Sequence, residues 1–95
     1  PELAGVMAKA HKEATYHLRH SAEWLVRLGD GTAESHARAQ RALDELWRYT
    51  DELFAGDAVE RAMVERGIGV DPATLRERWD ATVREACAEA PLAVP

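Results

Sequence analysis

Apolar side chains recur every three or four positions along the start of the chain and again after a short glycine-containing turn at residues 29–31. At 3.6 residues per turn, this spacing predicts two long amphipathic helices, over residues 2–28 and 33–53, with Thr32 as the cap of the second. Because the turn is short, we expect the two helices to form a long antiparallel hairpin. The positions that share a side are Leu3, Val6, Ala10, Ala14, His17, Ser21, Trp24 and Leu28 in the first helix and His36, Leu43, Trp47 and Phe54 in the second.

Two shorter helices are predicted in the second half of the chain. Asp57 is placed to cap a helix over residues 58–66, and Asp71-Pro72 is a strong start signal for a helix over residues 72–88. The chain is therefore expected to be a single all-α unit over residues 1–95. Two amphipathic helices of this length cannot cover both apolar stripes against each other, so we expect helices from elsewhere to complete the core.

The segments around the last helix are expected to lie extended. In residues 67–70, Ile68 and Val70 alternate with glycines, so their side chains should point the same way and hold the connector against the bundle. Residues 91–95 are apolar and bounded by prolines, which favours an extended path across something larger.

Composition narrows the class of protein. The 95 residues carry a net charge of −5, which opposes binding to nucleic acid, and no apolar run is long enough to span a membrane. Cys87 is the only cysteine, so we expect no internal disulfide and a reducing, cytoplasmic location. The chain starts without Met and almost directly in a helical pattern, and we interpret it as a fragment of a longer protein.

Histidines on an apolar helix face are the residues most suggestive of chemistry. Glu13, His17 and His20 project from one side of the first helix, and His36 lies on the second. Di-iron bundles use Glu-x-x-His pairs, but here neither His20 nor His36 has an acid three residues earlier. We therefore favour packing or hydrogen-bonding roles for these side chains, with metal binding by all four as the alternative.

Large apolar side chains indicate where the core or an interface should form. Tyr16 and Tyr49 lie beside the apolar stripes of their helices and are suited to contact a partner protein. Cys87 has no surrounding motif and is not expected to be a nucleophile. The expected core or interface residues are Trp24, Leu28, Leu43, Trp47, Phe54 and Trp79.

Two stretches carry a family resemblance: residues 17–54, HLRHSAEWLVRLGDGTAESHARAQRALDELWRYTDELF, and residues 67–79, GIGVDPATLRERW. With RLGDGT, SH, LW, YT and ELF at these intervals, the sequence resembles the C-subunit family of the bacterial ring-epoxidising phenylacetyl-CoA monooxygenases. That subunit is longer, so the chain is similar to its C-terminal portion.

The resemblance implies the C-terminal part of a ferritin-like bundle and a role in aerobic phenylacetate breakdown. In such a complex the di-iron centre belongs to the catalytic A subunit, which uses oxygen and NADPH-derived electrons to epoxidise the ring of the CoA thioester. The C subunit is structural and non-catalytic, and it pairs with the A subunit and stabilises it. The resemblance thus implies no catalytic residue, no cofactor and no metal in this chain.

Two other functions remain open at this point. One is a di-metal-binding, ferritin-like oxidase that uses Glu13, His17, His20 and His36. The other is a generic helical interaction module unrelated to phenylacetate. Association of the chain with copies of itself is also possible, because its apolar stripes otherwise stay partly exposed to water.

Overall fold

The structure, a computed structural model, describes residues 1–95 and contains only helical elements and their connections. The absence of any strand confirms the all-α prediction. In chain order the elements are α1 (Glu2–Gly29), α2 (Ala33–Leu46), the 3-10 helix η1 (Trp47–Phe54), α3 (Ala58–Glu65), the 3-10 helix η2 (Pro72–Leu75) and α4 (Arg76–Glu89). None of these helices combines the length and the apolar composition needed to cross a membrane.

Three helical segments begin where the sequence places a capping side chain. Thr32 accepts a hydrogen bond from the backbone N–H of Ser35 at 3.0 Å, and Asp57 accepts one from Glu60 at 2.8 Å. Asp71 accepts one from Ala73 at 3.0 Å, directly before Pro72. These bonds satisfy N–H groups that have no partner inside the helix, which is why the side chains fix the starting points.

The second helix is not α-helical along its whole predicted length. The α-helix ends at Leu46, and the chain continues as the 3-10 helix η1. Thr50 donates a hydrogen bond to the carbonyl of Trp47 at 2.8 Å, a local bond that competes with regular helix bonding. In η1 the rings of Trp47 and Phe54 both contact Trp79 of α4, so packing across the bundle accompanies the tighter winding.

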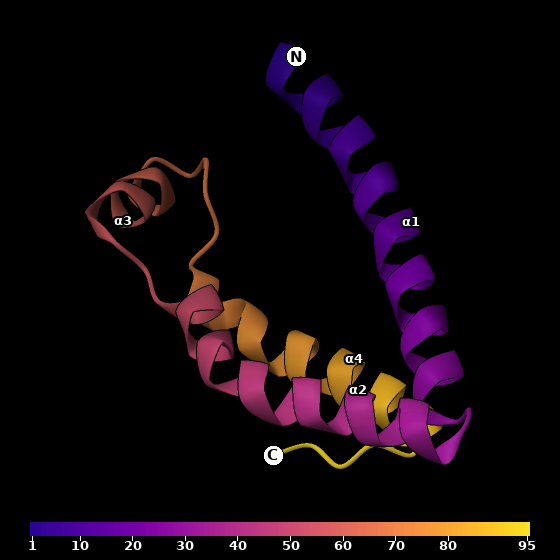
Figure 1. The fold of residues 1–95 in the computed structure, drawn as a ribbon. Helices are drawn as coiled ribbons and strands as arrows, with labels where there is room; N and C mark the ends of the chain where they lie inside the picture. Colours follow the sequence, from indigo (N-terminus) through magenta and orange to yellow (C-terminus); the bar gives the residue numbers. More distant parts are fainter.

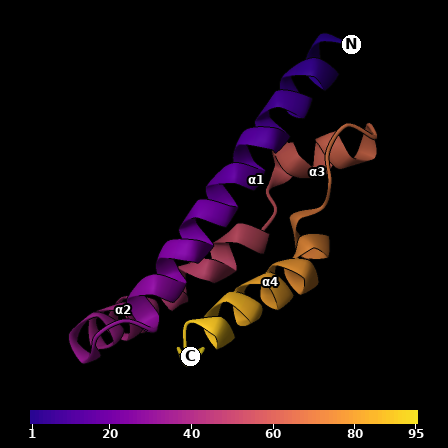
Figure 2. The ribbon, with the colours of Figure 1, turned by 90° about the vertical axis from the view of Figure 1, so that its right-hand side faces the viewer.

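The hairpin opens away from its turn. Figure 1 shows α1 and α2 diverging from residues 30–32, while α4 lies beside α2 and runs in the opposite direction. Figure 2, turned by 90°, shows α1 passing over the other helices towards its free end. Cys87, Ala90 and Leu92 form the small core near the turn between α1 and α2, where they contact partly buried side chains of α1, α2 and α4. Those side chains include Leu25 and Val26 of α1, Ala39 and Leu43 of α2, and Val83 of α4.

The core is small for a chain of this length. Only 5 of 95 residues are buried, and the radius of gyration is 16.3 Å, against about 12 Å for a compact domain of the same size. The expectation that the chain cannot complete a core by itself therefore agrees with the structure.

The region around α3 stands apart from the other helices (Figure 1). The prediction that Ile68 and Val70 hold the connector against the bundle is wrong, since they are 61% and 62% exposed. The N–H groups of Ile68 and Gly69 instead both bond to the carbonyl of Met63, at 3.0 Å each, and Gly67 adopts a φ of 72°. This local closure, which a glycine in the left-handed region permits, turns the connector back on α3.

Candidate functional site: a capped helix corner and an uncovered helix face

The corner between α1 and α2 is closed by two side chains from the first turn of α2. The Ser35 hydroxyl donates to the carbonyl of Leu28 at 2.6 Å, and the Nδ1–H of His36 donates to the carbonyl of Gly29 at 2.8 Å. Carbonyls in the last turn of a helix have no partner within it, so these bonds satisfy acceptors that would otherwise need water. The half-buried His36, for which a packing or hydrogen-bonding role was favoured above over metal binding, thus acts as a capping residue.

Gly31 allows this corner to be tight. A Cβ added there would lie 2.7 Å from the carbonyl oxygen of Arg27 and 2.8 Å from the Ser35 hydroxyl. Any larger side chain at Gly31 would therefore push α2 away from the end of α1 and break the serine cap.

The remaining candidate ligands lie on the exposed surface of α1. Glu13, His17 and His20 are all exposed, and the ring of His20 stacks on Tyr16 with centroids 6.2 Å apart. His17 meets the edge of the same tyrosine at 6.2 Å. No group of three histidine, cysteine or acidic side chains lies together in the chain, so these residues do not form a cluster of metal ligands by themselves. None of the three side chains is buried within the chain.

The predicted core residues fall into two groups. Phe54 is buried, and Leu43, Trp47 and Trp79 are half-buried. The ring of Trp79 lies 5.6 Å from that of Trp47 and 5.3 Å from that of Phe54. Trp24 and Leu28, in contrast, do not belong to the core of this chain.

Both side chains of that second group remain largely exposed. Trp24 is 47% exposed and Leu28 is 46% exposed. The Arg27 guanidinium of the same helix lies 5.2 Å from the centroid of the Trp24 ring. Both side chains are therefore free to meet another surface.

The first two-thirds of α1 form an uncovered face. Every residue from 1 to 21 is exposed, although the apolar stripe runs through this segment. Its large apolar side chains are Leu3, Val6, Met7, Tyr16 and Leu18. We call this surface the α1 face. A continuous apolar stripe left in water is typical of a surface that another protein segment covers.

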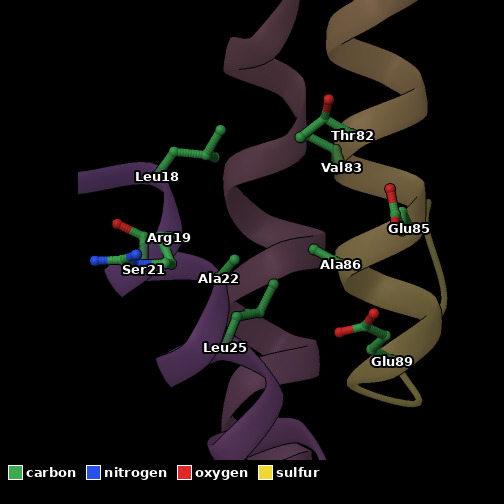
Figure 3. A pocket seen from close by; sticks show the side chains of 10 residues that line it. All are labelled: Leu18, Arg19, Ser21, Ala22, Leu25, Thr82, Val83, Glu85, Ala86 and Glu89. Atoms are coloured by element: carbon green, nitrogen blue, oxygen red, sulfur yellow. The ribbon is translucent and has the colours of Figure 1, made fainter. Parts of the chain in front are cut away.

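A groove continues this face between α1 and α4. Figure 3 shows Leu18, Ala22 and Leu25 on the α1 side opposite Val83 and Ala86 on the α4 side. The cavity measures about 450 Å³. Its charged lining is divided, with Arg19 on α1 and Glu85 and Glu89 on α4.

Cys87 is not available for chemistry in this structure. Its side chain is 1% exposed, and burial raises the pKa of its thiol, an effect that the nearby Arg84 guanidinium partly offsets. A neutral, buried thiol is a weak nucleophile.

The helices, the small core and the uncovered α1 face define a class of protein: this chain is an all-α protein with an apolar helix face of the kind that another protein segment covers. All of residues 1–95 match the family described as phenylacetic acid catabolic protein, and the chain belongs to that family.

One relative specifies the relationship further. The chain is 53% identical, over all of its 95 residues, to the C subunit of 1,2-phenylacetyl-CoA epoxidase from Escherichia coli strain K12. The resemblance stated from the two quoted stretches is thereby confirmed. The chain spans 38% of the length of that relative.

Proposed function

We propose that this chain is part of a structural, non-catalytic subunit of a multicomponent phenylacetyl-CoA ring epoxidase. In this proposal the subunit pairs with the di-iron catalytic subunit in the cytoplasm and stabilises it. The observation that carries the proposal is the 53% identity, along the whole chain, to the C subunit of an epoxidase. At that level of identity the same helices and the same packing surfaces are expected in both proteins.

The α1 face supports a role in assembly. Leu3 and Val6 are 58% and 61% exposed on a helix whose other side is polar. Covering such a stripe releases about 25 cal/mol for each Å² of apolar surface removed from water. We assign this face to contacts within the complex, which bury the stripe that the isolated chain leaves open.

The proposal leaves the redox chemistry to the catalytic subunit. There, di-iron, oxygen and NADPH-derived electrons would carry out the epoxidation. In this chain His36 caps α1, while His17 and His20 lie against Tyr16 on the surface. Their engagement in capping and ring contacts favours a structural subunit over the alternative of a metal-dependent oxidase.

Co-purification of the full-length protein with a tagged catalytic subunit tests the proposal. We expect a stable complex, and we expect Val6→Asp to lower the recovered amount about tenfold, because a charge enters the apolar stripe. Ala8→Asp is the matched control, since it adds the same charge about 200° around the helix from Val6. Failure of the unmodified protein to bind the catalytic subunit would overturn the proposed function.

Equal recovery of the two aspartate variants would instead remove the α1 face from the interface. Circular dichroism of both variants, compared with the parent protein, checks that helical content is unchanged. Because both changes lie on exposed positions of α1, neither is expected to unfold the chain.

A further inference from the structure

The segment that follows α4 doubles back along α2 instead of leaving the molecule (Figure 1). The side chain of Gln40 on α2 holds it by two hydrogen bonds to one residue. Its Nε2–H donates to the carbonyl of Ala93 at 2.8 Å, and the N–H of Ala93 donates to Oε1 at 2.9 Å. One amide side chain thus binds both backbone polar groups of Ala93, as a neighbouring strand would do.

Apolar contacts fix the same segment on its other side. Ala90 is fully buried and Leu92 is 6% exposed, and together with Cys87 they make up the core cluster. The N–H of Leu92 bonds to the carbonyl of Cys87 at 2.9 Å, which satisfies an acceptor at the end of α4. Two of the three residues of the core cluster therefore come from this segment, and none comes from α1.

Contact with the end of α1 is equally close. A Cβ added at Gly29 would lie 2.8 Å from the Cβ of Ala90 and would collide with its carbonyl oxygen. The absence of a side chain at Gly29 lets the last turn of α1 rest directly on Ala90. Leu25 and Val26, one turn earlier on α1, pack against the same cluster.

We propose that residues 90–94 form a clasp that fixes the direction in which α1 leaves the corner. The clasp is bound to α2 through Gln40 and to α4 by the covalent chain, and it supports α1 at Gly29. The direction of α1 in turn sets the width of the groove between α1 and α4. This proposal uses only contacts within the chain, so it holds or fails independently of the proposed role in an epoxidase.

The first test measures how often the clasp opens. Cys87 lies beneath it and is the only cysteine of the chain, so its rate of reaction with a thiol reagent under native conditions reports the opening. We expect Gln40→Ala to raise this rate about tenfold, since both hydrogen bonds to Ala93 are lost, together with one to Asp44 within α2. Leu92→Ala should raise it further, because the apolar anchor is shortened. Arg41→Ala is the matched control, an exposed neighbour on the same helix.

The second test measures the direction of α1. Spin labels are attached at two exposed positions, Ala10 on α1 and Ala81 on α4, through Ala10→Cys and Ala81→Cys in a Cys87→Ala background. We expect Gln40→Ala to broaden the distribution of distances between the labels, and Arg41→Ala to leave it narrow. The proposal is overturned if Gln40→Ala matches Arg41→Ala in both the thiol rate and the distance distribution.

Gln40→Glu is a second variant, which tests the proposal even if the shorter side chain of Gln40→Ala disturbs α2. It retains the acceptor for the Ala93 N–H but places a carboxylate oxygen against the Ala93 carbonyl. We expect a thiol rate above that of the parent protein. A rate equal to the parent rate would contradict the clasp.

Discussion

The two parts of α1 have the same sequence pattern and different surroundings. In residues 2–21 the apolar stripe is exposed along its whole length. In the last two turns of α1, Ala22, Leu25 and Val26 are half-buried and Gly29 is buried. The stripe does not change in character between the two parts. What changes is the presence of α4 and the clasp, which reach only the last turns of α1.

This difference shows that an amphipathic pattern specifies a face to be covered and not the partner that covers it. At the corner the partner lies within the chain, and small residues and hydrogen bonds fit the surfaces together. Along the α1 face every residue is exposed, and the ring of Tyr16, for example, contacts His17 and His20 of the same helix.

The largest expected effect comes from comparing two tryptophans. Trp79 contacts the rings of Trp47 and Phe54, and Trp79→Ala is expected to lower the free energy of unfolding by about 2 kcal/mol, less than for a fully buried tryptophan. Trp24→Ala, on the uncovered side, should cost about 0.5 kcal/mol or less. Urea unfolding followed by circular dichroism measures both. Equal losses would contradict the division between a packed end and an uncovered face.

A smaller effect is expected at the capped corner. Ser35→Ala and His36→Ala each remove one hydrogen bond to a carbonyl at the end of α1, and each should cost about 1 kcal/mol. Amide hydrogen exchange should show faster exchange in the last turn of α1 and no change in its first turns. An effect of the same size at both ends of α1 would argue against a local capping role.

The smallest expected effect is a dependence of stability on pH through Cys87. Burial raises the pKa of its thiol in the folded chain, so above about pH 8.5 the unfolded chain loses the thiol proton first. The contribution of Cys87 to the free energy of unfolding is therefore fully present below that pH and falls as the pH rises towards the folded pKa. Cys87→Ala should show a flatter alkaline profile in urea titrations. Identical profiles for the two proteins would indicate a thiol that is exposed to water.

Local features of the fold could be predicted because they depend on neighbours in sequence. Thr32, Asp57 and Asp71 cap the segments that they precede, and each of these bonds spans two or three residues. The end of α2 was harder to predict, since its conversion to a 3-10 helix accompanies contacts with Trp79, 25 or more residues further along the chain.

The roles of the histidines could be predicted only in part. The missing acids before His20 and His36 argue against a metal site without the structure. That His36 binds the carbonyl of Gly29 required the geometry of the turn, although a Ser-His pair four residues after Gly31, in the first turn of the next helix, was a signal for it. Gln40 was missed, because its partner Ala93 lies 53 residues away and offers only backbone groups, which leave no trace in sequence.

The sequence by itself determined where the helical segments start, their caps and the apolar stripe of each, since these follow from residue spacing and short-range hydrogen bonds. Only the tertiary structure decided which stripe is covered. That choice depends on where α4 and the clasp end in space, and on whether a glycine such as Gly29 allows two backbones to touch. The sequence predicts that α1 has an apolar face, and the tertiary structure leaves most of this face exposed to solvent.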